Sequence, residues 1–432
     1  MSKQRTLSKK TKIFLCLGIC LGALLLLFGI AEAYMRFGGF GTGACADTAE
    51  FAKYAQPIEA FAVPDGARVV ALGEATHGNR EFQALKLTVF RRLVETAGVR
   101  ALALEADFGC AETANRYIHG GGGTARDAAA ALGFAIYRTE EMAKLLVYMR
   151  AYNAEAPAGG DLVLYGMDMQ RVADSFRYLR EAAEACGADT ADFAALWDSE
   201  ADNFDAAYSA DARRETITAL RAAMLARGMA ADAPEVHFAD VLLQNLEYGA
   251  HFGDADGGNA MRDRMMAENV LWALRVEEGR AGGRLFVTGH NGHIERTAGG
   301  AGARMGNLLA EALGDGYFAV GTDFYKSLCN LPRADGTRLT HTFYSHDPLA
   351  KAAKACGKDI CYLDFAAVPA TSPLAATLAE TVPNGSLGEM YDAFFMRLFP
   401  ASYRVMRVPA QNYDAMIFVA DAHPTVILPA EN

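Results

Sequence analysis

Short apolar runs recur along this chain, and each of them stops at a cluster of polar or charged residues. The first run, residues 68–72, leads directly into Gly-Glu-Ala-Thr-His-Gly at 73–78. Short apolar runs bounded by such breakers are typical of buried strands. We therefore predict strands at residues 68–72, 99–104, 161–165, 284–287, 317–320, 360–363 and 416–419.

Helical periodicity fills most of the intervals between these runs. Phe82, Leu85, Phe90 and Leu93 recur at the spacing of an amphipathic helix that ends near Gly98. A short helix is expected within residues 50–62. Strands that alternate with helices predict an α/β fold, in which a mostly parallel sheet carries helices on both faces.

One long interval contains no predicted strand. From residue 171 to about residue 279, Ala, Leu, Glu, Arg and Met dominate at helical spacing. We therefore predict a helical insertion over residues 172–280, and we expect it to form a cap over the ligand site.

The N-terminus predicts a membrane anchor. Residues 13–30 are uncharged and apolar, and five basic residues precede them, which places the N-terminus inside and the remainder outside. The alternative is a cleaved signal peptide, since Ala31-Glu32-Ala33 has a small-x-small form. The apolar run exceeds the roughly 7–15 residues of a cleavable core, which favours an uncleaved anchor. The expected organisation is a basic cytoplasmic tail (1–12), a single transmembrane signal anchor (13–35), a linker (36–50) and an extracytoplasmic domain (51–432).

Composition limits the classes of partner. The 432 residues are 52% hydrophobic and 22% charged, as in ordinary globular proteins, and the net charge is -11. An acidic chain without a basic cluster beyond its tail is a poor candidate for nucleic acid. An oxidising compartment would permit disulfides, while buried free thiols are equally compatible with the sequence; the cysteines concerned are Cys45, Cys110, Cys186, Cys329, Cys356 and Cys361.

Polar residues follow the predicted strands at the points where the strands end. Ligands of parallel α/β sheets bind beyond the carboxyl ends of the strands, so these residues are expected to share one site and indicate an enzyme. The residues that follow the successive strands are Glu74, His77 and Arg80; Glu105 and Asp107; Asp168; His290 and His293; and Asp323.

His77 is the candidate general base, because an imidazole accepts a proton from water near neutral pH. Glu74 or Glu105 would orient its ring, and His290 or His293 would donate to a developing oxyanion. In the alternative interpretation, His77 caps the following helix while Glu74 pairs with Arg80. Arg262, on a helix expected to border the cleft, would contact substrate or lie on a solvated face.

Other chemistries find less support in the sequence. No G-x-S-x-G nucleophile elbow and no phosphate-binding glycine motif is present. The side chains of His77, Glu105, His290 and His293 are possible zinc ligands, but HExxH is absent and the spacing neither requires nor excludes a metal. We predict no metal and no other cofactor.

Several of these blocks resemble the erythromycin esterase family. The matching blocks are Gly73–Gly78 with Glu81-Phe82, Leu104–Asp107, Gly166–Asp168, Arg262-Asp263 with Met266–Asn269, and His290–His293. The resemblance implies a metal-independent hydrolase that opens macrolide lactones, on a mixed α/β fold with a helical part over the site. It also implies that His77 activates water and that Glu74, Glu105, His290 and His293 assist.

We predict a membrane-anchored extracytoplasmic hydrolase of an ester or lactone. A macrolide is one candidate substrate, and its hydrolysis would confer macrolide resistance. The macrolide-resistance members of the family are soluble, which separates them from this chain. Alternatives are a metal-dependent hydrolase or peptidase with the same cluster, and a non-catalytic cell-surface binding protein. The predicted substrate-binding residues are Arg80, Asp107, Asp168, Arg262 and Asp323.

Overall fold

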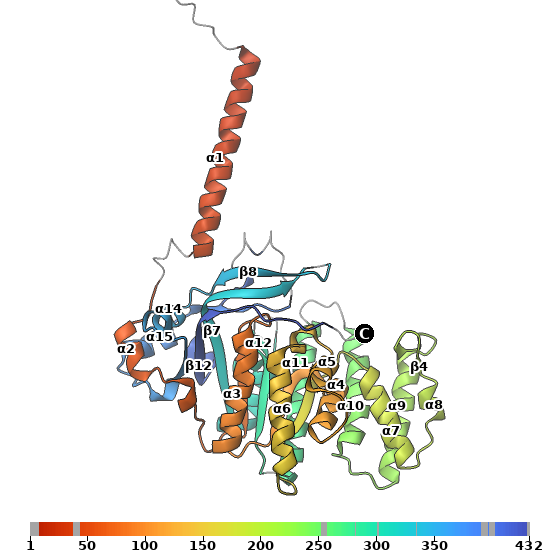
Figure 1. Ribbon diagram of the computed structural model, residues 1–432. Helices are drawn as coiled ribbons and strands as arrows, with labels where there is room; N and C mark the ends of the chain where they lie inside the picture. The colour runs from red at the N-terminus through yellow and green to blue at the C-terminus, as the bar shows by residue number, and fades with distance from the viewer. Residues whose placement is uncertain are drawn as a thin grey trace, which may run out of the picture.

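A computed structural model shows a mostly parallel sheet flanked by helices, with one long helix standing apart at the N-terminus (Figure 1). The structure describes residues 8–37, 44–251, 257–280, 282–299, 302–333, 335–389, 396 and 402–429. Residues 1–7 of the expected tail and 38–43 of the expected linker lie outside these ranges. The predicted α/β fold class is confirmed.

All seven predicted strands are present, in the sheet order β3-β2-β6-β1-β7-β12-β9. Neighbours from β3 to β12 run parallel, and β9 pairs antiparallel with β12. The strands are β1 (Val69–Glu74), β2 (Ala101–Asp107), β3 (Val163–Asp168), β6 (Leu285–His290), β7 (Tyr317–Pro332), β9 (Ile360–Asp364) and β12 (Ala415–Ala422).

The structure also contains strands that the apolar pattern did not predict. β7 continues far beyond Val320 and pairs antiparallel with β8 (Arg338–Tyr344). Two further pairs are β10 (Val382–Gly385) with β11 (Arg404–Arg407), and β4 (Trp197–Asp198) with β5 (Asn203–Phe204). The expectation of no strand within 171–279 is therefore wrong for β4 and β5. These segments are short or interrupted by polar residues. They form strands because they pair with a partner strand, and their sequences contain no apolar run that would predict them.

The helices occupy the predicted intervals. The helix expected within 50–62 stops at Tyr54 and is followed by a 3-10 turn at Ile58–Ala60, since Pro57 lacks an N–H for a helical bond. The helices are α1 (Lys9–Phe37), α2 (Thr48–Tyr54), α3 (Arg80–Thr96), α4 (Phe108–Ile118), α5 (Ala125–Ala131), α6 (Glu140–Glu155), α7 (Ala173–Ala185), α8 (Ala191–Ala194), α9 (Ala210–Ala226), α10 (Pro234–Ala250), α11 (Gly257–Arg280), α12 (Asn291–Ile294), α13 (Met305–Leu313), α14 (Pro348–Ala355), α15 (Pro373–Ala379) and α17 (Pro409–Asn412).

The helical insertion expected over 172–280 coincides with α7 to α11. In Figure 1, α7 to α10 stand beyond β3, at the side of the sheet, and α11 packs on β3 and β6. The insertion reaches the strand ends through α11. Whether any part of it acts as a cap stays a prediction.

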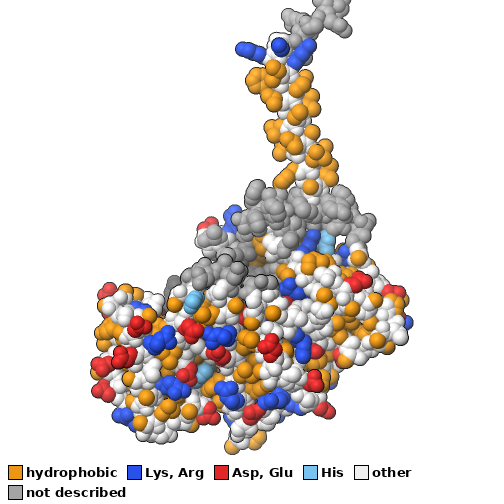
Figure 2. Space-filling model, turned by 180° about the vertical axis from the view of Figure 1, so that it is seen from behind, with side chains coloured by type: hydrophobic (Ala, Val, Ile, Leu, Met, Phe, Trp, Pro, Cys, Tyr) orange, Lys and Arg blue, Asp and Glu red, His pale blue; other side chains and the backbone are white. Residues whose placement is uncertain are grey.

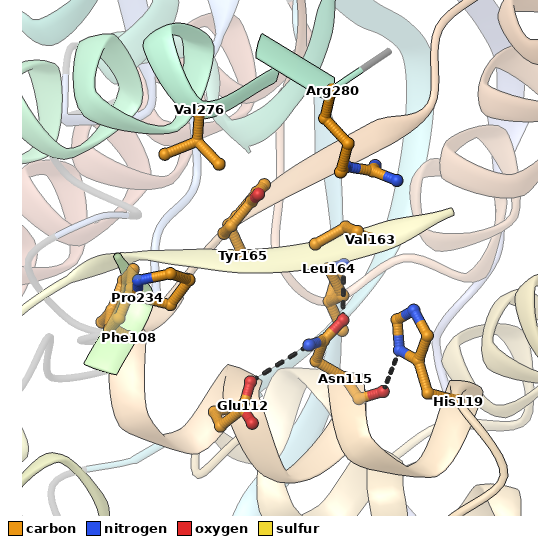
Figure 3. Close-up of a pocket in the computed structure, with 11 residues that line it drawn as sticks. Phe108, Glu112, Asn115, His119, Val163, Leu164, Tyr165, Pro234, Val276 and Arg280 are labelled. Carbon is orange, nitrogen blue, oxygen red and sulfur yellow. Dashed lines mark hydrogen bonds between the residues drawn. The ribbon is translucent and has the colours of Figure 1, made fainter. Parts of the chain in front are cut away.

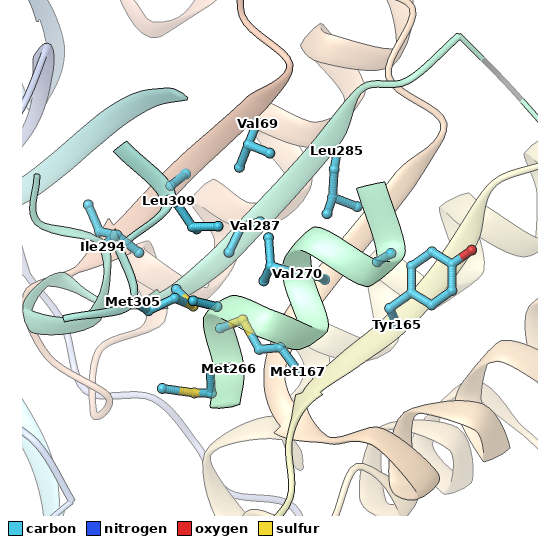
Figure 4. Packing of buried hydrophobic residues seen from close by; sticks show 14 of the residues in the cluster. Val69, Tyr165, Met167, Met266, Val270, Leu285, Val287, Ile294, Met305 and Leu309 are labelled. Atoms are coloured by element: carbon cyan, nitrogen blue, oxygen red, sulfur yellow. The ribbon is translucent and has the colours of Figure 1, made fainter. Parts of the chain in front are cut away.

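Two cores bury the two faces of the sheet. Val69 and Ala71 of β1 belong to the core under α11 and α13, whereas Val70 and Leu72 face α3 and α6. Figure 4 shows the first core, where Val69, Leu285 and Val287 lie against Val270 and Met266 of α11. Burial on both faces explains why the strands appear as continuous apolar runs.

Helix α1 is the one helix in the described part of the chain that is long and apolar enough to cross a membrane, over Lys9–Ala31. No part of this stretch is buried inside the protein, and hydrophobic side chains surround it, with basic ones at its N-terminal end (Figure 2). A helix that is apolar all round is typical of a membrane span or a signal sequence.

We predict that Gly73→Ala destabilises the fold. A Cβ at Gly73 would lie 2.2 Å from Asn291 Oδ1, and Asn291 in turn holds the backbone of Thr322 through bonds of 2.7 and 3.1 Å. The expected cost is about 1–3 kcal/mol, measured by urea unfolding. Gly279→Ala is the control, because a Cβ there meets open space in α11; equal stability of the two variants would contradict the argument.

Candidate active site

The ends of three adjacent strands bring the predicted residues together. β2, β6 and β1 are neighbours in the sheet, and Glu74 of β1 lies in register with His290 of β6. The backbone N–H of His290 donates to Glu105 Oε2 at 2.8 Å, which joins β6 to β2. The cluster is therefore assembled by the order of the strands rather than by nearness in sequence.

Glu74, 2% exposed, is the centre of one half of the cluster. Its Oε1 lies 2.5 Å from His77 Nδ1, and its Oε2 lies 3.0 Å from the Lys86 ammonium and 3.2 Å from Gln83 Nε2. Lys86 and Gln83 come from α3, the helix that follows the His77 turn. The carboxylate is thus held between an imidazole and an ammonium.

These contacts set the protonation of the pair. Burial alone would raise the pKa of Glu74, but Lys86 and His77 outweigh it and lower this pKa to about 2. Burial would lower the pKa of His77, yet the Glu74 carboxylate outweighs it and raises this pKa above 6.5. Glu74 is therefore ionised, and it fixes His77 with Nδ1–H toward the carboxylate and Nε2 left to accept a proton.

The second half of the cluster is built around Arg262 of α11. Its guanidinium lies 2.9 Å from Glu105 Oε1 and 2.6 Å from Asp168 Oδ2. His293 places Nε2 3.2 Å from Glu105 Oε1 and Nδ1 2.7 Å from Asp263 Oδ1. Arg262 Nη1 also lies 3.2 Å from His293 Nε2. Because a guanidinium can only donate, the Nε2–H of His293 donates to Glu105 instead.

The acidic residues of this half determine its charges. Burial would lower the pKa of His293, but Glu105 and Asp263 raise it to about 10, so His293 is a cation at neutral pH. Burial, reinforced by Asp168, raises the pKa of Asp107 to about 7. Asp107 accepts the Arg171 N–H at 2.7 Å, while its Oδ2 is buried without a hydrogen-bond partner.

His290 lies between the two halves and is neutral. Burial, together with the nearby His77 and His293, lowers its pKa to about 3. Its Nδ1 accepts the Gly292 N–H at 3.2 Å, which leaves the ring proton on Nε2, 3.4 Å from Ser386 Oγ. The centres of the His290 and His77 rings are 5.2 Å apart, so the two imidazoles are direct neighbours in the cluster.

Two predicted substrate-binding residues lie apart from this cluster. Arg80 is largely exposed, pairs with Glu81 and donates its backbone N–H to His423, so the alternative pairing of Glu74 with Arg80 is wrong. Asp323 is fully buried and accepts bonds from Ser345 and Asn384. Asp168 and Arg262 bind one another within the cluster, and neither role in substrate binding is tested.

Sequence reasoning missed several members of the site. Lys86 and Gln83 lie on the helical face assigned to packing, and Asp263 was noted only as the neighbour of Arg262. Leu387, in the segment after β10, was not predicted to lie near the site, although it accepts the His77 N–H at 3.3 Å and donates to Ala75 at 2.7 Å. Only the charge of Lys86, six positions after Arg80 on the largely apolar face of α3, could have signalled a role in the site.

The described residues contain no group of three His, Cys, Asp or Glu side chains arranged as metal ligands. The eight cysteines, all within the described ranges, carry free thiols. A separate cavity of about 390 Å³ lies along β3, lined by Phe108, Tyr165 and Val276 with His119 and Arg280 (Figure 3). It contains none of the histidines of the cluster.

Comparison with known proteins gives a consistent result. The chain matches the family model of erythromycin esterase over residues 94–422, a range that includes Glu105, Arg262 and both cluster histidines of β6 and α12 but begins after His77. Erythromycin esterase type II of Escherichia coli is 26% identical over 356 residues, covering 70% of this chain and 81% of that protein. Putative hydrolase YbfO of Bacillus subtilis is 25% identical over 368 residues, covering 72% and 80%.

Solved structures share the fold. A protein from Bacillus cereus superposes with a TM-score of 0.71 at 21% identity, covering 89% of this chain and 100% of its own. A succinoglycan biosynthesis protein gives 0.70 at 17% identity, covering 88% and 98%. A histidine-to-asparagine variant of erythromycin esterase EreC in its open conformation gives 0.55 at 18% identity, covering 84% and 93%.

We predict that His293 stays doubly protonated from pH 6 to about pH 9. Both ring nitrogens donate to carboxylates, which raise its pKa to about 10. Nitrogen-15 NMR of histidine-labelled protein should show two protonated ring nitrogens over this range. Asp263→Asn should move the titration of His293 to lower pH, and a His293 that titrates near pH 6.5 in the unaltered chain would contradict the assignment.

Proposed function

Because this chain belongs to the erythromycin esterase family, we propose that it is a hydrolase that cleaves an ester or lactone with water activated by His77. The observation that carries the proposal is the buried Glu74–His77 pair, whose imidazole centre lies 5.2 Å from the centre of the His290 ring. Macrolide lactones are the first substrates to test, in view of the Escherichia coli relative.

The reaction follows from the protonation states. His77 Nε2 takes a proton from water as the oxygen attacks the carbonyl carbon, and Glu74 stabilises the imidazolium that forms. The Nε2–H of neutral His290 donates to the oxyanion, as a preorganised donor in a buried site. Collapse of the tetrahedral intermediate breaks the ester bond, and the His77 imidazolium returns its proton to the leaving alkoxide.

The second half of the cluster supports this centre rather than reacting. Glu105 binds the His290 backbone, Arg262 and His293, so the loop that carries His290 is held from two sides. The cationic His293 adds positive potential near the oxyanion. Asp168 binds the Arg262 guanidinium and maintains its position.

We predict that His77→Ala lowers kcat by about 10²–10⁴-fold, the range of a lost general base. The raised pKa of His77 means that the base form grows as pH rises, so kcat/KM of the unaltered enzyme should increase through an apparent pKa above 6.5. Hydrolysis of a panel of macrolides, lactones and simple esters, followed by mass spectrometry, is the measurement.

His119→Ala is the matched control, since His119 lies on the rim of the β3 cavity away from the cluster. A chelator is included in each assay. Full activity of His77→Ala would overturn the mechanism, and turnover lost with the chelator and restored by a divalent ion would favour the metal-dependent alternative.

We also propose that α1 anchors the protein in the cell membrane with the hydrolase domain outside. The apolar length of Lys9–Ala31 and the basic residues at its start support this arrangement. We predict that the full chain stays in the membrane fraction after an alkaline carbonate wash and is degraded by protease added to intact cells. Release into the wash, or a mature N-terminus after Ala33, would support a cleaved signal peptide instead.

A further inference from the structure

We propose that Lys86 is a positioning residue of this site, whose buried positive charge keeps the Glu74–His77 pair free of an extra proton at working pH. The proposal rests on the proposed function of His77 as the base. Lys86 does not reach the reacting atoms in this account and acts through Glu74.

The geometry isolates Lys86 from solvent and commits it to Glu74. The side chain is 2% exposed, and its ammonium lies 3.0 Å from Glu74 Oε2 and 2.8 Å from Gln83 Oε1. On another side the ammonium lies 5.1 Å from the centre of the Tyr137 ring. A buried lysine on an apolar helix face is costly unless its charge is compensated, and Glu74 supplies the compensation.

The charge balance gives the direction of the effect. With Lys86 present, ionised Glu74 and neutral His77 form a set of net charge zero, and protonation of His77 creates a buried net positive charge. Without Lys86 the same two groups carry a buried net charge of -1, which a proton would neutralise. Removal of Lys86 should therefore make the pair bind a proton more tightly, and the base would be blocked at neutral pH.

Other charged groups near the pair do not replace Lys86. Glu105 and Glu389 face His77 from β2 and from the segment after β10, and both are acidic. His290, from the end of β6, is neutral, and Tyr137 keeps its proton because burial and the nearby carboxylates raise its pKa. Glu105 is itself paired with Arg262 and His293, and Glu389 is paired with Arg338, so those cations are committed to other carboxylates. Lys86 is thus the cation in direct contact with Glu74.

A purely structural role for Lys86 predicts a different result. If Lys86 only filled space in the core, a near-isosteric Lys86→Met would lower activity equally at every pH and would leave the titration of His77 unchanged. The electrostatic role predicts a shift of the titration itself.

The test is an NMR titration of histidine-labelled full chain in detergent, with His77 assigned by its loss in His77→Gln. In Lys86→Met, the pKa of His77 should rise by at least about one unit relative to the unaltered chain. The acidic limb of kcat/KM should move upward by the same amount, so that activity falls about tenfold or more at pH 7 and recovers at higher pH. Lys144→Met, an exposed change on α6, is the matched control and should shift neither.

The double variant Glu74→Gln/Lys86→Met separates charge from packing. It leaves no uncompensated buried charge, so the pKa of His77 should fall below that of the unaltered chain, opposite to the single variant. If Lys86→Met fails to fold, recovery of folding in the double variant supports the proposal, and a double variant that is equally unstable overturns it.

The two proposals fail in different ways. An unchanged His77 titration in folded Lys86→Met overturns the role of Lys86 even when the unaltered enzyme hydrolyses esters. A shifted titration in a protein that hydrolyses no substrate in the panel leaves the charge coupling intact and rejects the proposed function.

Discussion

An ionised carboxylate buried at the end of a central strand is the constraint on which this site depends. Glu74 is 2% exposed and still keeps its charge, because an imidazole and an ammonium bind its two oxygens. Loss of one partner of such a buried pair typically costs about 3–5 kcal/mol, since the remaining charge is left unpaired. The turn of His77 and the start of α3 are therefore held in place by the same interaction that orients the His77 ring.

The sheet itself separates the chemistry into two halves. Residues of β1 and α3 hold the Glu74–His77 pair on one face, whereas residues of β2 and α11 form the Arg262 and His293 network on the other. The halves meet across β6, where the backbone of His290 binds Glu105 and its ring lies beside His77. This arrangement gives the three histidines different pKa shifts: burial lowers the pKa of His290, Glu105 and Asp263 raise that of His293, and Glu74 raises that of His77.

Membership of the erythromycin esterase family accounts for the fold and indicates an ester hydrolase. The choice of substrate depends on the residues that surround the cluster. The relatives named above share about a quarter of their residues or less with this chain, and their names range from an erythromycin esterase to a succinoglycan biosynthesis protein. The same scaffold is therefore found in proteins with different names, and the contacts around the cluster must be examined before a substrate is assigned.

The sequence by itself determined seven strands of the main sheet, because a strand buried on both faces must be apolar along its whole length, and the alternation with helices then implied a parallel sheet. It also identified Glu74, His77, Glu105, Arg262, His290 and His293, since polar residues at the carboxyl ends of such strands converge. It could not identify Lys86 or Ser386, because one lies on a helix face that looks like core and the other follows a strand with no apolar run. It also predicted Asp323 and Arg80 as substrate-binding residues, whereas both lie apart from the cluster. Only the tertiary structure decided these positions, because the strand order brings distant segments into contact, and that contact sets which side chains are buried, paired and charged.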